Sequence, residues 1–412
     1  MTLSMSTTPS PQASSPQVPP PRTPPPLSSP VRGWSAVVAV ALGTFTVVTT
    51  EMLPVGLLTP MGASLEVTEG TAGLTLTVTG LVAAATAPFV PTLIGRADRK
   101  VVLVALMLLL AAANLLSAWA PDFTVMVTAR VLVGLGMGGV WALAAGLAPR
   151  LVPERSVGSA TSTVFSGIAV ASVFGVPVGA YIGALADWRA AFVSFAVLAL
   201  LVAAAMVVLL PRLPSERAAR LSGVTGLLRN PRVATGLLLA VLLVTGHFAA
   251  YTYVRPVLET TAGVSAGLVG TMLLVYGLAG VVGNFASGPR AVRAPRATLV
   301  VLGAALGGSV FLLPWIGVTV LGAGVLMAVW GLAYGGVSVS AQTWMMRAAP
   351  EKREAVSSLF VGVFNGSIAL GALVGGLVLD GAGGTALLWL AAALALGALA
   401  TALLGRAPAR TS

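Results

Sequence analysis

Long apolar runs separated by short polar connections cover almost all of the chain after residue 33. A helix that crosses the apolar part of a bilayer takes about 17–25 residues, because it rises about 1.5 Å per residue. Twelve runs reach that length: 34–58, 71–93, 101–120, 123–147, 157–183, 190–210, 233–257, 264–287, 297–314, 318–345, 355–379 and 383–405. The pattern predicts an all-α integral membrane protein with twelve transmembrane helices.

The composition supports a membrane protein and narrows its chemistry. Hydrophobic residues make up 57% and charged residues 8% of the chain, against roughly 45–50% and about 25% in soluble domains. Without cysteine, disulfides and thiolate metal sites are excluded. No Ser-His-Asp set, metal cluster or pair of intramembrane carboxylates favours an enzyme. Neither Lys100 nor Lys352 belongs to a phosphate-binding loop, so an ATP-driven pump is not expected.

The positive charges predict the topology. Of the 23 Lys and Arg residues, all except Arg130, Arg189 and Arg255 lie in the tails and in the even-numbered connections between runs. Such residues accumulate in cytoplasmic loops, so we expect both termini to be cytoplasmic. The basic residues that give the net charge of +11 are then explained by the topology and by contact with anionic lipid. We therefore expect no nucleic-acid partner.

Polar segments divide the chain. Residues 1–33 are rich in Pro, Ser and Thr and predict a disordered cytoplasmic tail. We expect an N-terminal six-helix bundle over 34–210, a cytoplasmic linker over 211–232, a C-terminal six-helix bundle over 233–405 and a short tail over 406–412.

A repeat agrees with this division. Gly134, Gly138 and Gly139 recur 197 positions later as Gly331, Gly335 and Gly336. The polar positions that follow also recur: Arg150, Pro153, Glu154 and Arg155 correspond to Arg347, Pro350, Glu351 and Lys352. A repeat of about half the chain indicates a duplicated architecture.

Glu51 and Arg130 are ionisable residues inside the expected spans. Each lies seven residues from the outer end of its run, about 10 Å below the surface. An ionisable side chain at that depth is costly unless it faces a cavity or a partner. We therefore expect Glu51 and Arg130 to serve proton coupling, with Arg130 altering the proton affinity of Glu51. The alternative is a structural role, in which Arg130 braces helix ends.

Polar side chains recur at helical spacing in three spans of the second half, where they would share a helix face. They are His247 and Tyr251 in the seventh span, Tyr276 and Asn284 in the eighth, and Tyr334 and Gln342 in the tenth. With Thr44 and Trp141 from the first half, they are our candidates for lining a substrate cavity. Pairing across helices is the alternative. Arg255, near the outer edge, is expected to be an interface residue.

Four short segments carry motifs. They are 95–100 (GRADRK), 130–136 (RVLVGLG), 175–179 (GVPVG) and 50–58 (TEMLPVGLL). With the twelve spans, the repeat and the central basic loop, they resemble the major facilitator superfamily over residues 34–405. The segment 50–58 is similar to the bacterial twelve-span drug:proton antiporter branch, especially its sugar, purine and chloramphenicol efflux relatives.

The resemblance implies roles for particular residues. Gly95, Asp98 and Arg99 would form a cytoplasmic gate, and Glu51 and Arg130 would serve proton coupling. An antiporter-like motif is formed by Gly175, Pro177 and Gly179, although Val176 separates the first glycine from the proline.

The function expected from these observations is secondary active transport. The chain would export a small molecule, drug, sugar or nucleoside-like, across the bacterial cytoplasmic membrane by proton antiport and alternating access. A proton-linked importer or a passive facilitator of a sugar or nucleoside is the alternative. We expect no cofactor, a proton gradient as the energy source, contact with membrane lipid and a monomeric protein.

Overall fold

The computed structural model describes residues 30–87, 89, 90, 94, 95, 97–144, 146–214 and 224–406. The expected N-terminal tail lies outside the described residues except for 30–33, which form the first turn of a helix. Part of the expected linker, 215–223, and the last six residues also lie outside them. The described residues form helices and short connections, without a β-strand.

The described residues of the first half contain six long helical segments. Its elements are α1 (Pro30–Ser64), α2 (Glu69–Thr86), α4 (Arg99–Ala118), α5 (Phe123–Ala144), α6 (Ala148–Leu151), η1 (Glu154–Ser156), α7 (Val157–Val170), the π-helical η2 (Ala171–Gly175), α8 (Val176–Leu185) and α9 (Trp188–Leu209).

The second half repeats that plan. Its elements are α10 (Val224–Leu228), α11 (Pro231–Tyr251), α12 (Val254–Ala262), α13 (Ala266–Arg293), α14 (Pro295–Ile316), α15 (Val320–Gly335), α16 (Val337–Ala348), η3 (Pro350–Lys352) and α17 (Arg353–Leu404).

The helix lengths are consistent with the twelve expected spans. Ten helical segments among the described residues are long and apolar enough to cross a membrane. One of them, α17, turns back at Gly383, where φ is 83°, and so contains two of the expected runs. The remaining expected span, 71–93, corresponds to the threonine-rich α2.

Three expected spans are broken in the structure. The break at Gly336, between α15 and α16, has no proline nearby, whereas proline explains the other two. A proline removes a backbone donor, and its ring clashes with the carbonyl four residues earlier. For Pro177 that carbonyl belongs to Val173, in η2. For Pro256 it belongs to Thr252, where α11 gives way to α12.

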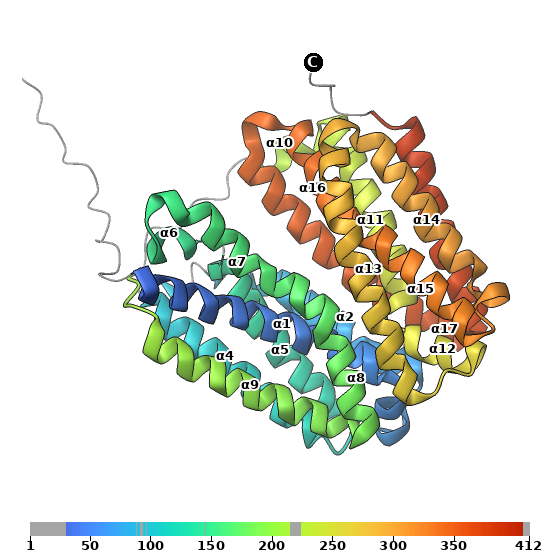
Figure 1. Ribbon diagram of the computed structural model, residues 1–412, viewed down its shortest axis with the longest axis horizontal. Coiled ribbons are helices and arrows are strands. Elements are labelled where there is room, and N and C mark those ends of the chain that lie inside the picture. Colours follow the sequence, from blue (N-terminus) through green and yellow to red (C-terminus); the bar gives the residue numbers. More distant parts are fainter. Residues whose placement is uncertain are drawn as a thin grey trace, which may run out of the picture.

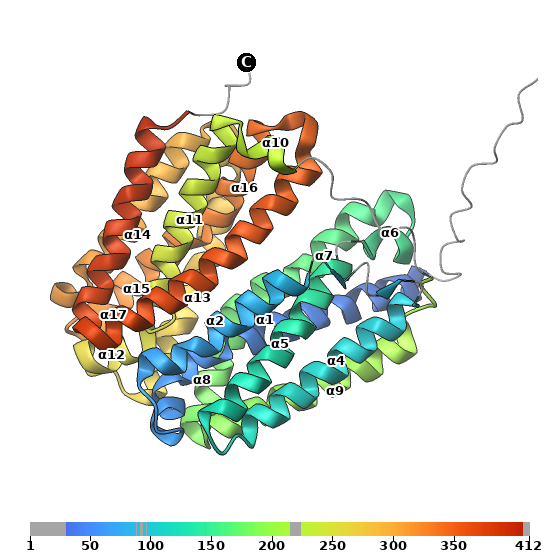
Figure 2. The same ribbon diagram turned by 180° about the vertical axis from the view of Figure 1, so that it is seen from behind.

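The helices form two bundles that touch at one end and diverge at the other (Figure 1). Figure 2 shows the same arrangement from behind, with α8 and α12 at the touching end and α6 and α10 at the diverging end. Three of the four hydrophobic clusters each lie within one half of the chain. The remaining cluster joins Leu58 and Leu76 of the first half to Tyr251 and Trp330 of the second. We call this shared cluster the bundle contact.

Candidate functional site

Glu51 lies on the face of α1 that leads into the bundle contact. Val55 and Leu58 follow it by four and seven residues, on the same helix stripe, and both belong to that contact. The Glu51 side chain is only 4% exposed. Among the described residues, no hydrogen bond or ion pair is found for its carboxylate. Glu51 is therefore a buried acid without a hydrogen-bond or ion-pair partner in the described part of the chain.

Arg130 contacts the helix that carries Glu51, but not the Glu51 carboxylate. From α5 it donates to the backbone oxygen of Thr50 over 3.1 Å and to Ser117 Oγ over 2.8 Å. Its guanidinium also lies 5.0 Å from the centre of the Phe192 ring. In this arrangement no hydrogen bond or ion pair joins Arg130 to the Glu51 carboxylate. Arg130 braces α1 against α4 and α5, and its role in proton coupling stays a prediction.

His247 is the centre of an aromatic cluster in the second half. Its Nδ1 accepts a hydrogen bond from Trp330 Nε1 over 3.0 Å, and its Nε2 lies 3.3 Å from the Tyr276 hydroxyl. Indole nitrogen can only donate, so Nδ1 carries no proton. The imidazole is then neutral with its proton on Nε2, and it donates to Tyr276.

Two further rings are stacked on His247. The Tyr334 ring is nearly parallel to the imidazole at a centroid separation of 3.4 Å, and the Tyr251 ring is parallel at 5.0 Å. The Tyr334 hydroxyl is buried without a hydrogen-bond partner. The structure thus brings together four of the expected cavity residues, His247, Tyr251, Tyr276 and Tyr334, from three helices. We call these four residues with Trp330 the aromatic cluster.

The other expected cavity residues do not join this cluster. The Thr44 hydroxyl donates to the Val164 carbonyl at the contact of α1 with α7, and Trp141 stacks on Phe165 of α7. Gln342 donates to Ser357 of α17. Asn284 is exposed, two turns beyond the point where Gly277 of α13 meets Val173. Thr44 and Gln342 thus pair across helices in this arrangement, and their place in a substrate cavity stays a prediction.

The expected gate residues bind within the first bundle. Asp98 caps α4 by accepting from Lys100 N, and it also accepts from Leu213 N; Arg99 N donates to Leu213 O. Gly95 has a φ of 52°, which favours glycine. These contacts tie the loop before α4 to the chain that leaves α9, at the diverging end.

The antiporter-like glycines place α8 directly on α1. A Cβ atom on Gly175 would overlap the Thr49 hydroxyl, and one on Gly179 would overlap Leu53. Small residues allow this close approach of two helices in lipid. Pro177 is the second residue of α8, directly after the π-helical turn.

Sequence reasoning missed Trp330 and Ser117, the partners of His247 and Arg130. Trp330 could have been found, because it lies one turn before Tyr334 on the stripe that continues to Ser338. Ser117 gives no such signal. Arg255 was expected to be an interface residue, but it is 4% exposed and donates to the Gly56 carbonyl. No group of three His, Cys, Asp or Glu residues in the described part could hold a metal ion.

Comparisons with known proteins agree with this architecture. The family model described as Major Facilitator Superfamily matches residues 40–367. The purine ribonucleoside efflux pump NepI of Salmonella paratyphi B is 35% identical over 350 residues, which cover 85% of this chain and 88% of that protein. NepI of Salmonella typhimurium has the same identity and coverage.

Solved structures show the same fold at low identity. The nucleoside transporter NupG superposes with a TM-score of 0.72 and 15% identity, over 90% of this chain and 98% of that chain. A bacterial homolog of the human lysosomal transporter Spinster, in an inward-facing and occupied conformation, has a TM-score of 0.68 and 17% identity, over 91% and 95%.

Proposed function

The chain belongs to the major facilitator superfamily, and on that premise we propose that it exports a purine nucleoside or a similar planar molecule by exchange for protons. The protein is a transporter in the bacterial cytoplasmic membrane, with several membrane-spanning helices. The proposal concerns its substrate, its direction and its energy source.

The observation that carries the proposal is the aromatic cluster, whose Tyr251, Tyr276 and Trp330 belong to the bundle contact. Planar rings stack favourably on aromatic side chains, which add about 0.5–1.5 kcal/mol per pair beyond the burial of apolar area. A purine base matches the ring stack of Tyr251, His247 and Tyr334 in shape and chemistry. The similarity to purine ribonucleoside efflux pumps supports the same class of substrate.

Glu51 is the acid best placed to exchange a proton. An uncompensated charge inside a membrane span costs several kcal/mol, so a buried carboxylate without a partner favours binding a proton or a cation. Glu51 lies one turn before Val55 of the bundle contact, so a rocking motion about that contact would change the exposure of Glu51 to water. Arg130 keeps its backbone contact with Thr50, which fixes the position of α1 around Glu51.

In the proposed cycle the two bundles rock about the central contact. With both termini cytoplasmic, the diverging end faces the cytoplasm, and substrate enters from that side. Closure of that end and opening of the other would release the substrate outside, and protonation of Glu51 from outside would reset the transporter.

The test is uptake of a labelled purine nucleoside, such as inosine, into inside-out membrane vesicles. Export then appears as uptake, and an acid vesicle interior should drive accumulation. We expect Glu51→Gln to lower this accumulation at least tenfold while substrate exchange without a gradient continues. Glu154→Gln, at an exposed position in η1, is the matched control. Undiminished proton-driven accumulation by Glu51→Gln would refute the role of Glu51.

Two arms of this assay address the remaining choices. Unlabelled adenosine should compete with inosine, whereas ribose, which has no aromatic ring, should not; competition by ribose alone would point to a sugar. A proton-linked importer would not accumulate substrate in vesicles with an acid interior. A passive facilitator would equilibrate substrate regardless of the pH difference.

A further inference from the structure

Asp380 binds the opposite bundle at the touching end. Its carboxylate accepts from the Thr68 hydroxyl over 2.6 Å and from Gly70 N over 3.0 Å. Thr68 and Gly70 lie at the start of α2, whereas Asp380 lies in α17 just before its turn at Gly383. One carboxylate of the second bundle is thus held by two donors of the first.

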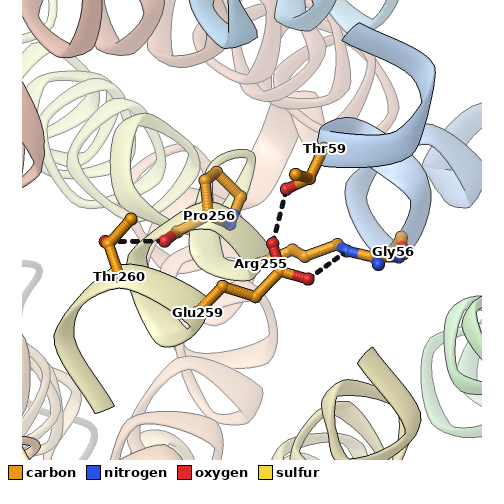
Figure 3. A network of polar contacts seen from close by, with 6 residues as sticks. All are labelled: Gly56, Thr59, Arg255, Pro256, Glu259 and Thr260. Atoms are coloured by element: carbon orange, nitrogen blue, oxygen red, sulfur yellow. Dashed lines mark hydrogen bonds and ion pairs between the residues drawn. The ribbon is translucent and has the colours of Figure 1, made fainter. Parts of the chain in front are cut away.

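A second connection lies on α12 and is drawn in Figure 3. Arg255 Nε donates to Glu259 Oε1 over 2.8 Å, and Arg255 Nη1 donates to the Gly56 carbonyl of α1 over 2.6 Å. The other oxygen of Glu259 accepts from Thr59 of α1 over 2.7 Å. The ion pair lies within α12, and each of its members also binds α1.

Glycines of α2 allow the bundles to approach closely between these connections. A Cβ atom on Gly70 would overlap Asp380 and the Gly376 carbonyl, and one on Gly73 would overlap the Tyr253 hydroxyl. Further along, the Thr77 hydroxyl donates to the Ala369 carbonyl over 3.3 Å. A larger side chain at Gly70 would force α2 away from α17, and one at Gly73 would force it away from Tyr253.

We propose that Arg255, Glu259 and Asp380 form a latch that closes this end of the transporter and must open for substrate to be released there. Where Arg255, Glu259 and Asp380 contact the first bundle, each of these charged groups meets a hydroxyl, amide or carbonyl group. Arg255 and Glu259 remain paired when the bundles separate. The first bundle contributes only uncharged groups to these contacts, so opening leaves none of its charges without a partner. The latch can therefore open and close repeatedly.

The latch can be tested by the accessibility of one thiol, because the chain contains no cysteine. Thr77→Cys places the thiol in the bundle contact, where Thr77 is 4% exposed. Its rate of reaction with a membrane-impermeant methanethiosulfonate reagent, added from the side of the latch, measures how often this end opens. Adding Asp380→Ala should raise the rate at least tenfold, because the closed state then loses two hydrogen bonds to a charged group.

A matched control is Asp122→Ala. Asp122 lies in a connection expected on the same side, but its carboxylate accepts from Val125 N within the first bundle. This change should leave the rate within twofold of the Thr77→Cys parent. An equal acceleration by Asp122→Ala would overturn the latch in favour of a general effect of surface charge.

Gly70→Ala tests the latch by a different mechanism, because it removes no hydrogen-bonding side chain. It should also accelerate labelling, whereas Gly267→Ala, at an exposed glycine with open space around it, should not. A separate Ala203→Cys reporter, buried in the first bundle, must stay slow in each variant, which excludes unfolding. Parental rates in both Asp380→Ala and Gly70→Ala would overturn the proposal. The assay reads conformation, so its outcome does not depend on the substrate.

Discussion

The indole of Trp330 donates to Nδ1 of His247 over 3.0 Å. This bond fixes which nitrogen of the only histidine in the chain carries the proton. It also joins α15 to α11 beneath the ring stack. Trp330 is therefore a positioning residue for the proposed substrate site.

Trp330→Phe should weaken substrate binding without abolishing transport. The change keeps an aromatic ring but leaves a buried acceptor on His247 unsatisfied, which costs about 1–3 kcal/mol. We expect KM for inosine to rise about tenfold with a smaller change in maximal rate. Trp315→Phe is the control, because Trp315 is exposed and stacks on Trp389 instead. An unchanged KM in Trp330→Phe would show that His247 needs no fixed orientation.

Ser117→Ala should destabilise the first bundle through Arg130. Ser117 accepts from the Arg130 guanidinium over 2.8 Å, and both side chains are buried. Losing that acceptor should lower the free energy of unfolding by about 1–3 kcal/mol, measured by thermal unfolding in detergent. Ser194→Ala removes an exposed hydroxyl that binds only within α9. It should have little effect, and equal losses in the two variants would contradict the bracing role.

Alanine substitutions at two glycines of α7 should have different effects on the stability of the protein. A Cβ atom on Gly167 would overlap the Ala41 carbonyl and the Thr44 hydroxyl of α1, whereas Gly158 has open space around it. Alanine is favoured over glycine inside helices by about 1 kcal/mol. Gly158→Ala should therefore be neutral or stabilising in thermal unfolding, and Gly167→Ala should be destabilising. Similar effects at both sites would contradict the close contact of α7 with α1.

Opening of the latch should depend on pH through Glu69. This residue lies in the polar first turn of α2, outside the expected span 71–93. Burial, followed by the negative charges of Glu259 and Asp380, raises the pKa of Glu69 above its usual value, and Thr59 opposes the shift. Separation of the bundles would remove the influence of Glu259 and Asp380, so the closed state binds this proton more tightly.

The sign of the effect follows from that difference. Protonation of Glu69 stabilises the closed state. This stabilisation is complete at pH values below the ordinary pKa of a glutamate, and it is lost as the pH rises through the raised pKa of Glu69. The labelling rate of Thr77→Cys, divided by the labelling rate of the exposed Gly267→Cys, should therefore increase with rising pH. Glu69→Gln should flatten this profile, whereas Glu66→Gln, at an exposed neighbour, should preserve it. An unchanged profile in Glu69→Gln would contradict the assignment.

Local patterns predicted much of the candidate site. The spacing of His247 and Tyr251 placed both on one helix face, and the structure shows their rings stacked. Glu51 stood out because an acid inside an apolar run has few structural uses. Thr44 and Gln342 looked equivalent to those residues in sequence, but they bind Val164 and Ser357. A single run shows which residues share a face, but not which helix that face meets.

The sequence by itself determined the helices, the duplication and the burial of Glu51 and Arg130, because hydropathy and helical spacing are properties of nearby residues. Only the tertiary structure decided that Arg130 binds the Thr50 carbonyl and that Asp380 binds Thr68 and Gly70. These partners lie far apart in the chain, with Thr68 and Asp380 separated by 312 positions. They meet because helix faces that carry glycine let particular helices approach closely. Which helices pair in this way depends on the packing of all the helices together.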